Sequence, residues 1–249
     1  MLKNEGLSAR TSDRALDEFI MAVQRLLKRL LSTRDLLARK LHFYVPLSPL
    51  NTMWRMLDKD TKSILDIGCG KGEPMMFING RRKFRVVGID IFKPYLEETK
   101  RQGVYRDIIL GDVRHLPLKR KSFDAVMCLE VVEHLEKEDG ERLLQAMEEV
   151  ARKQVILSTP VGRFEHKDNF NPYQEHRSFW MPVELKRLGY KIRGYGLPLI
   201  GGQKGLLARL PEPLRTIRRI IWILASFFSQ FFPESAGWMI CTKILTSAS

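Results

Sequence analysis

Residues 64–72 read ILDIGCGKG and decide the fold of this chain. An apolar run that leads directly into a glycine-rich turn is typical of a buried strand of a parallel sheet, with a ligand at its carboxyl end. The glycines at alternate positions let the backbone bend sharply and approach a ligand closely, because no Cβ intervenes. Their spacing is GxGxG, unlike the GxGxxG of dinucleotide-binding folds, and no GK[ST] follows for a triphosphate. The sequence therefore predicts a buried strand and a ligand-binding turn of another kind.

Strand and helix patterns alternate from this stretch onward, which is typical of a doubly wound α/β sheet. Seven strands are predicted, at residues 63–67, 85–89, 107–110, 123–128, 155–158, 190–195 and 237–245. Helices are predicted at residues 50–57, 94–101, 141–152 and 182–188. The predicted fold class is therefore α/β, with a doubly wound, mostly parallel sheet.

Two acidic residues follow the next two predicted strands. Asp90 stands where α/β nucleoside-binding folds place the acid that accepts hydrogen bonds from ribose hydroxyls. Asp112, after the third strand, could accept a hydrogen bond from an adenine amino group. Singly, each acid is more often a helix cap or a surface residue. Their agreement in order and position indicates a nucleoside-type cofactor.

Four segments, LDIGCGKG, VVGID, GDVRHLPLKRKSFDAV and LEVVEHL, occur in this order within residues 63–196. Through them the chain resembles the class I S-adenosylmethionine (SAM) dependent methyltransferases, particularly the branch that includes the ubiquinone and menaquinone biosynthesis enzymes. The resemblance implies a Rossmann-like sheet of seven strands whose last strand is antiparallel. It also implies SAM as the cofactor, lying across the carboxyl ends of the first three strands.

The resemblance assigns cofactor contacts residue by residue. The methionine part is expected near Asp66, Gly68, Cys69 and Gly70, the ribose near Asp90 and Ile91, the adenine near Asp112 and Val113, and Leu129 follows the fourth strand. One departure from the family pattern is Glu73-Pro74 after the glycine turn, where smaller or apolar residues are common. This pair is expected to alter how the first helix starts.

The segment EVVEH at residues 130–134 has two interpretations. On a helix, positions i, i+3 and i+4 share a face, so Glu130, Glu133 and His134 could converge on a hard divalent cation or on the substrate. The pattern resembles the magnesium-linked one of ubiquinone-pathway O-methyltransferases. Relatives with a similar segment and no metal favour the other interpretation, in which these residues shape the pocket. No metal is therefore the primary expectation.

A polar and aromatic stretch follows the fifth predicted strand, at residues 166–180. A loop that leaves the carboxyl edge of the sheet here would face the transferred methyl group, so it is the best candidate for a substrate wall. His134, Tyr173 and His176 are the candidate catalytic residues, and His166 is a further candidate base. A lone histidine is more often only a hydrogen-bonded polar residue.

Charge and composition limit the partners and the compartment. The 249 residues carry a net charge of +13, which favours an anionic partner, either a membrane surface or nucleic acid. The three cysteines, Cys69, Cys128 and Cys241, form no CxxC pair, which suits a reducing cytosol. The polar N-terminus lacks the pattern of a secretory signal. A cytoplasmic protein, in part peripheral to a membrane, is therefore expected.

Two basic amphipathic helices suggest the membrane rather than nucleic acid. The first is predicted at residues 12–31, within an N-terminal segment 1–45, and the second at residues 214–232, within an insertion 197–236 of a methyltransferase domain 46–249. Either helix could instead pack on the domain or on a second subunit. The charge-free run 220–232 would be only about 20 Å long as a helix, too short for the roughly 30 Å of bilayer hydrocarbon.

The expected function is methyl transfer from SAM to a small-molecule or lipid-like acceptor at oxygen, carbon or nitrogen. Holding donor and acceptor in line lowers much of the barrier, so the sequence can reveal the donor without revealing the acceptor. One alternative is an RNA methyltransferase, favoured by the charge but lacking an NPPY-like motif, paired cysteines or an RNA-binding module. The other is a protein that binds SAM without catalysis.

Overall fold

A computed structural model gives the structure of residues 48–198 and 227–245. The predicted N-terminal segment 1–45 and most of the predicted insertion 197–236 lie outside these residues. Of the predicted helix at 214–232, only residues 227–232 are described, and residues 227–229 are helical. No helix in the described ranges is long and apolar enough to cross a membrane.

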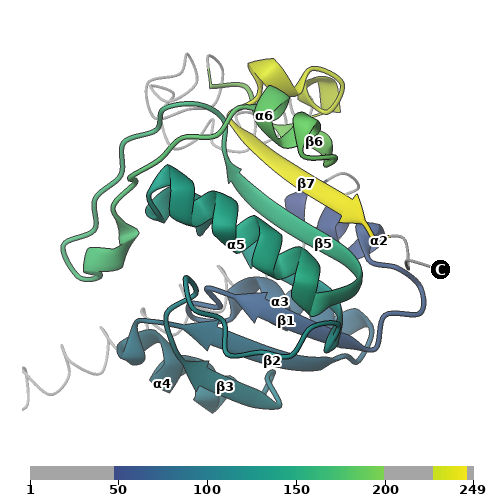
Figure 1. Cartoon of the computed structure of the whole chain (residues 1–249), viewed down its shortest axis with the longest axis vertical. Helices are drawn as coiled ribbons and strands as arrows, with labels where there is room; N and C mark the ends of the chain where they lie inside the picture. The colour runs from purple at the N-terminus through teal and green to yellow at the C-terminus, as the bar shows by residue number, and fades with distance from the viewer. Residues whose placement is uncertain (1–47, 199–226, 246–249) are drawn as a thin grey trace, which may run out of the picture. The chain divides into compact units, whose positions relative to one another are not determined.

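Seven strands form one sheet in the order β3-β2-β1-β4-β5-β7-β6 (Figure 1). Their bounds are Ser63–Ile67 (β1), Arg85–Asp90 (β2), Asp107–Leu110 (β3), Phe123–Leu129 (β4), Ala151–Pro160 (β5), Lys191–Tyr195 (β6) and Trp238–Ile244 (β7). β1 to β5 pair in parallel, and β7 runs antiparallel to both β5 and β6. The predicted seven-stranded α/β fold is confirmed, including its antiparallel last strand.

Helices join the strands and cover both faces of the sheet. They are Pro49–Met56 (α2), Glu73–Arg81 (α3), Lys93–Gln102 (α4), Lys137–Val150 (α5) and Pro182–Arg187 (α6). α5 lies over one face, and α2 and α3 lie over the other (Figure 1). The described residues also contain three short 3₁₀ turns, Val132–His134 (η1), Pro172–Gln174 (η2) and Pro233–Ser235 (η5).

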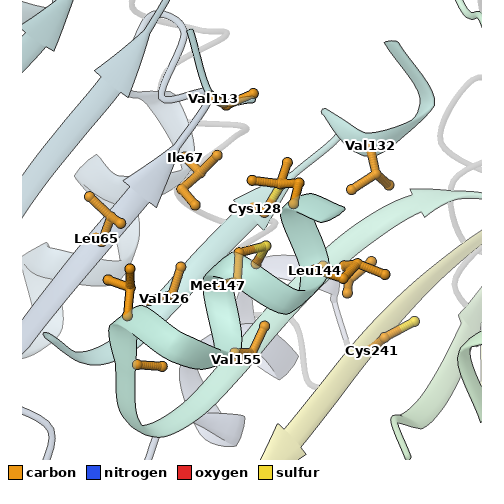
Figure 2. Close-up of a cluster of buried hydrophobic side chains, with 14 of the residues drawn as sticks. Leu65, Ile67, Val113, Val126, Cys128, Val132, Leu144, Met147, Val155 and Cys241 are labelled. Carbon is orange, nitrogen blue, oxygen red and sulfur yellow. The ribbon is translucent and has the colours of Figure 1, made fainter. Parts of the chain in front are cut away.

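The hydrophobic core has two layers because both faces of the sheet are covered. On the α5 side, Leu144 and Met147 pack with Leu65 and Ile67 of β1 (Figure 2). On the other side, Ile64 packs with side chains of α2 and α3. Each such buried side chain contributes about 1.5–3 kcal/mol relative to exposure. This double burial explains why residues 64–67 of β1 are apolar apart from Asp66.

The boundary between α5 and β5 differs from the prediction. The helix predicted at residues 141–152 begins earlier, at Lys137, and ends at Val150. Ala151 already has extended backbone angles, φ −76° and ψ 138°, and pairs with Phe123 of β4. Ala151 and Arg152, which helical periodicity had assigned to the helix, therefore belong to β5.

The first helix after the glycine turn starts in the ordinary way despite Glu73-Pro74. Gly72, with φ 75°, occupies the N-cap position, and Glu73 is the first helical residue. Proline lacks a backbone N–H, but the first turn of a helix has no intrahelical acceptor for that group. A carboxylate in the first turn also suits the helix dipole. The sequence departure therefore does not disturb the start of α3.

Candidate cofactor and acceptor site

One cavity of about 310 Å³ lies at the carboxyl edge of the sheet. It is lined by Gly68, Gly70, Asp90, Ile91, Asp112, Val113, Arg114, Glu130, Val131, His134, Leu135, Glu136, Asp139, Asn171, Tyr173, Gln174 and Arg177. Because β1 to β4 are parallel, their following loops meet at this edge, which brings together residues that are far apart in the sequence. Six of the predicted cofactor residues and two of the predicted catalytic residues line the same cavity.

The glycine turn forms one side of the cavity with a left-handed backbone. Gly68 has φ 66° and Gly70 has φ 51°, a region that side chains other than glycine adopt at a cost. A Cβ on Gly70 would meet no protein atom closer than 3.9 Å, so the residue opens onto the cavity. A Cβ on Gly68 would lie 2.2 Å from Cγ2 of Val131. Glycine is therefore required for different reasons at the two positions. At Gly70 it leaves space for a ligand, and at Gly68 it lets the turn pack against Val131.

Asp90, the last residue of β2, fixes the glycine turn. Its Oδ2 accepts a hydrogen bond from the backbone N–H of Gly70 at 2.8 Å, and its Oδ1 accepts one from that of Phe92 at 2.8 Å. Burial raises the pKa of Asp90, and these backbone donors oppose the shift. A carboxylate has further lone pairs to offer. Asp90 can therefore hold the turn and still accept hydrogen bonds from a ligand.

Asp112, in the loop after β3, also lines the cavity. Arg114 donates to both oxygens of Asp112 from Nε, at 3.0 Å each, and these hydrogen bonds lower the pKa of Asp112. Nη1 of Arg114 also lies 3.9 Å from an oxygen of Asp139 on α5. The arginine thus ties the loop after β3 to α5. Asp112 is kept ionised at the position where an adenine amino group is expected.

Three residues of the predicted cofactor set do not line the cavity: Asp66, Cys69 and Leu129. Asp66 is 3% exposed, and its Oδ2 accepts a hydrogen bond from the hydroxyl of Tyr105 at 2.6 Å. Burial raises the pKa of Asp66 to about 7. Cys69 is buried, and burial raises the pKa of its thiol above the usual range. Leu129 packs at the edge of the core layer on the α2 side.

Residues 130–134 do not form the α-helical face that the sequence suggested. Glu130 has φ 55°, a left-handed conformation that is unusual for a side chain other than glycine, and only Val132–His134 is helical, as the 3₁₀ turn η1. The oxygens of Glu130 accept hydrogen bonds from Ser158 Oγ at 2.6 Å and from Trp238 Nε1 at 3.1 Å. Such strain is concentrated at functional sites, and Glu130 lines the cavity.

A different trio comes together instead: Glu133, His134 and His176 each offer a ligand atom within 4.8 Å of the others. Glu133 is 2% exposed, its Oε2 accepts from Thr159 Oγ1 at 3.0 Å, and its Oε1 has no hydrogen-bond partner among the described residues. Burial, and then the nearby charge of Glu130, raise the pKa of Glu133 well above its usual value. A proton or a cation must offset this buried carboxylate.

Backbone carbonyls orient the two histidines of the trio. Nδ1 of His134 lies 3.2 Å from the carbonyl oxygen of Glu175, and Nδ1 of His176 lies 2.5 Å from that of Phe164. Because a carbonyl can only accept, each Nδ1 carries the proton and each Nε2 is left as the acceptor. Burial lowers the pKa of His134 to about 4 and also lowers that of His176. Of the two, only His134 lines the cavity.

The predicted substrate wall forms the far side of the cavity. Asn171, Tyr173, Gln174 and Arg177 line it. The wall is fixed to η1, because the backbone N–H groups of Arg177 and Ser178 donate to the carbonyl of Glu133 at 2.8 and 3.1 Å. Its tip packs on the start of α4, where the rings of Phe92 and Phe170 have centroids 5.4 Å apart. The wall therefore spans the cavity from η1 to α4.

Sequence reasoning missed several lining residues. The cavity is also lined by three charged residues to which the sequence analysis gave no role: Arg114, Asp139 and Arg177. Arg114 stands two residues after Asp112, a spacing that could have suggested the ion pair. Asp139 and Arg177 carry no such signal, because only the fold brings α5 and the wall to this edge.

Comparisons with known proteins agree with this fold. Residues 65–159 match the family described as Methyltransferase domain. Norajmaline N-methyltransferase from Rauvolfia serpentina is 30% identical over 199 residues, covering 75% of this chain and 64% of that protein. An uncharacterised protein from Methanocaldococcus jannaschii is 28% identical over 138 residues, covering 52% and 55%. The chain thus spans less than two thirds of the length of these curated relatives.

Solved structures share the fold at low sequence identity. A SAM-dependent methyltransferase from Archaeoglobus fulgidus is 17% identical with a TM-score of 0.55, covering 80% of this chain and 92% of that one. Phosphoethanolamine N-methyltransferase 2 from Haemonchus contortus, solved with SAM, is 13% identical with a TM-score of 0.51, covering 78% and 51%. This chain therefore has the class I methyltransferase fold, residues 65–159 match a methyltransferase domain, and these findings support SAM as the cofactor.

The cavity fits this cofactor. The open space beside Gly70 is one that a Cβ would enter, and the acceptors that a nucleoside requires, Asp90 and Asp112, lie on the same cavity. An amine or hydroxyl donor of the ligand would meet an ionised carboxylate at Asp112. The ubiquinone-like branch of the family receives no such support from these comparisons.

Proposed function

Since residues 65–159 form a methyltransferase domain, we propose that the protein transfers the methyl group of SAM to an oxygen, carbon or nitrogen atom of a small-molecule or lipid-like acceptor. The observation that carries the proposal is a single cavity with the glycine turn, Asp90 and Asp112 on one side and the polar wall with Tyr173 on the other. Two relatives named as N-methyltransferases support nitrogen among the acceptor atoms.

The residues of the cavity divide between the two ligands. Gly68, Gly70, Asp90, Asp112 and Val113 would hold SAM, which when bound supplies a methyl group on a positively charged sulfur. The wall residues would hold the acceptor opposite them. A cavity of this kind accelerates transfer mainly by fixing the two partners in line and by excluding water.

His134 is the proposed base where the acceptor must lose a proton. It lines the cavity, and the hydrogen bond from its Nδ1 to the carbonyl of Glu175 leaves Nε2 free to take that proton. Tyr173, also on the cavity, could position the acceptor through its hydroxyl. His176 does not line the cavity, so its proposed role is to position His134, whose ring centroid lies 4.9 Å away.

Calorimetry of SAM and of its demethylated product tests the central proposal. Asp90→Ala removes a charged acceptor and the anchor of the glycine turn, so affinity should fall about ten- to a hundredfold. Asp107→Asn, at an exposed acid on β3, is the matched control and should change nothing. A folded wild-type protein without measurable affinity for either compound would end the proposal.

The acceptor class is tested by incubating the protein and labelled SAM with a cell extract, which is then separated into lipid, RNA, protein and small molecules. Label in the lipid or small-molecule fraction is expected. Label confined to RNA would replace the proposal by an RNA methyltransferase. Tight SAM binding with no label in any fraction would favour the non-catalytic alternative.

The trio of Glu133, His134 and His176 favours a second candidate role, a divalent-cation site in place of the predicted set with Glu130. Two imidazole nitrogens and one carboxylate are a common ligand set for divalent transition metals. Titration of the protein with Mn²⁺ or Zn²⁺ tests it directly. His176→Ala should weaken binding at least tenfold if the site exists. Unchanged methyl transfer in a chelator, together with no metal binding, would leave these residues the pocket-shaping role.

A further inference from the structure

Four phenylalanines gather on the surface just before β7. Phe227, Phe228, Phe231 and Phe232 are 54%, 58%, 68% and 53% exposed. Their rings contact one another in pairs, Phe227 with Phe231 at 5.6 Å between centroids and Phe228 with Phe232 at 4.9 Å. We call these four residues the phenylalanine surface. Single exposed apolar side chains are ordinary, but four exposed aromatic rings within six residues are typical of an interaction site.

The segment that carries these rings is fixed on the sheet by its other side. Ser229, between the two pairs of phenylalanines in the sequence, and Pro233, directly after them, are buried. They pack so closely on β6 that a Cβ added to Gly194 would lie 2.4 Å from the carbonyl oxygen of Ser229. Arg193 of β6 donates to Gln230 at 3.4 Å, and Lys186 of α6 pairs with Glu234 at 2.6 Å. The rings are therefore held outward by the packing beneath them.

The segment that carries the phenylalanines is followed by Trp238, the first residue of β7, which contacts a residue of the cavity. Trp238 Nε1 donates to Oε2 of Glu130, which lines the cavity, and the Trp238 ring lies 5.7 Å from that of Phe164, two residues before the wall. Trp238 pairs with Pro160, the last residue of β5, at the carboxyl edge of the parallel strands. The segment that carries the phenylalanines therefore leads into β7 at the edge of the sheet where the cavity lies.

Charge selects the occupant of this surface. The chain carries a net charge of +13, and Arg215, Arg218 and Arg219 precede the phenylalanines in the sequence. Exposed basic side chains of β6, Lys191 and Arg193, belong to the strand on which the segment packs. Aromatic rings with neighbouring basic residues are the combination that binds the interface of an anionic bilayer.

We propose that the phenylalanine surface docks the protein on an anionic lipid membrane, where a membrane-borne acceptor reaches the cavity from the same edge of the sheet. This inference rests on the proposed methyl transfer to a lipid-like acceptor. It adds that the protein meets this acceptor at the membrane surface. The rings enter the interface between headgroups and acyl chains, and the exposed basic side chains of β6, Lys191 and Arg193, remain at the headgroups.

Flotation of the full chain with vesicles tests the docking. The probes are vesicles of phosphatidylcholine alone and vesicles with roughly one third phosphatidylserine. Wild type should bind the anionic vesicles more tightly and lose affinity as salt rises, because salt screens the attraction. The double substitutions Phe227→Ser/Phe231→Ser and Phe228→Ser/Phe232→Ser should each lower binding about ten- to thirtyfold, since each removes two partly exposed rings.

Ile244→Ser is the matched control, because Ile244 is 60% exposed and lies at the far end of the same strand, β7. It should bind vesicles like wild type. Equal binding by wild type and both phenylalanine variants would overturn the proposal, as would wild type that binds neither vesicle. Tighter binding to single-stranded RNA than to anionic vesicles at the same salt would overturn it in favour of a nucleic-acid partner.

Calorimetry of SAM on the same variants separates this inference from the proposed function. The phenylalanine variants should keep wild-type affinity for SAM, because none of the four rings lines the cavity. Vesicle binding by a protein without SAM affinity would end the proposed function alone. SAM affinity without vesicle binding would end the docking proposal alone.

Discussion

Gly68 and Gly70 share a left-handed backbone but have different surroundings, so the same substitution should have different effects at the two positions. Gly70→Ala strains the turn by about 1–2 kcal/mol and places its methyl group in the cavity. We expect a folded protein with at least tenfold weaker binding of SAM. Gly68→Ala drives its methyl group into Val131, so unfolding should become easier by about 2–5 kcal/mol.

A double variant distinguishes these two effects. Gly68→Ala with Val131→Ala removes the methyl groups that meet the new Cβ, and it should recover part of the lost stability. The same Val131 change should not restore SAM binding to Gly70→Ala. Chemical denaturation and calorimetry give the two readouts. Equal loss of stability in both glycine variants would contradict the assignment.

Asp66 should make the stability of the protein depend on pH. Its pKa is about 7 in the folded chain and lower when unfolded, so between about pH 4 and 7 the folded state holds the extra proton. Below about pH 4 Asp66 is protonated in both states and does not affect stability. As pH rises from about 4 to 7, the unfolded state loses this proton more readily than the folded state, so the free energy of unfolding falls. Asp66→Asn keeps an acceptor for Tyr105 and avoids this cost, so it should gain up to about 4 kcal/mol over wild type above pH 7.

The measurement is the difference in free energy of unfolding between Asp66→Asn and wild type, at pH 5 and at pH 8. Taking the difference cancels the pH-dependent contributions of the histidines. Their lowered pKa values make stability rise with pH, opposite to the effect of Asp66. The gain should be larger at pH 8. A gain that is equal at both values would show that Asp66 is ionised throughout.

At the site, the sequence predicted those cavity residues that directly follow a strand. Asp90 and Asp112 were predicted from their positions after β2 and β3, and both line the cavity. Glu133 and His176 could not be paired in advance, because η1 is a 3₁₀ turn and the wall folds back on it. Hydrogen bonds between segments, such as those of Arg177 and Ser178 to Glu133, have no signature in a single sequence.

Among the elements, the amino-terminal edge of the sheet depends on Asp124 at the start of β4. Its Oδ2 accepts from the backbone N–H groups of Lys62 and Ser63 at 2.9 and 3.0 Å, and its Oδ1 accepts from Arg152 of β5 at 2.9 Å. Hydrogen bonds to a charged group contribute about 1.5–3 kcal/mol each in measured cases and do not add fully. Asp124→Ala should therefore lower the free energy of unfolding by about 2–4 kcal/mol.

The pH dependence of this contribution follows from the pKa of Asp124, which its hydrogen bonds hold at about 2, below the unfolded value. The stabilisation should be complete above about pH 4 and be lost as pH falls toward 2. Asp107→Asn is the control, because Asp107 is an exposed acid whose nearest ion-pair contact is 3.8 Å long and should matter by less than about 0.5 kcal/mol. Denaturation of both variants at pH 6 tests whether Asp124 stabilises the fold through its hydrogen bonds. A loss as small as that of Asp107→Asn would mean that Asp124 acts only as a surface charge.

Strand positions were predictable because both faces of the sheet are covered, which makes β1, β2 and β4 nearly continuous apolar runs between polar turns. The least accurate boundary was that of α5 with β5. Lys137 and Glu138 open the helix with polar residues that give no apolar periodicity, and Ala151 and Arg152 suit a helix as well as a strand. Pairing with β4 decides the conformation of Ala151, and pairing is a property of the fold.

For the whole molecule, ligand binding should appear as thermal stabilisation. SAM at a hundred times its dissociation constant stabilises a folded protein by about 2.7 kcal/mol, which for a domain of this size raises Tm by about 5–10 °C. Asp90→Ala should show almost no rise at the same concentration. A rise of equal size in wild type and variant would indicate that the ligand binds elsewhere.

The order β5-β7-β6 also affects how the chain can fold as it is synthesised. β6 pairs only with β7 within the described sheet, and β7 is made roughly forty residues later. At about 5–20 residues per second, the exposed edge of β5 and the whole of β6 wait roughly 2–8 s for the strand that joins them. Unpaired strand edges are templates for association with other chains. A nascent chain of this protein should therefore recruit chaperones until β7 has emerged, although five parallel strands are already available to fold.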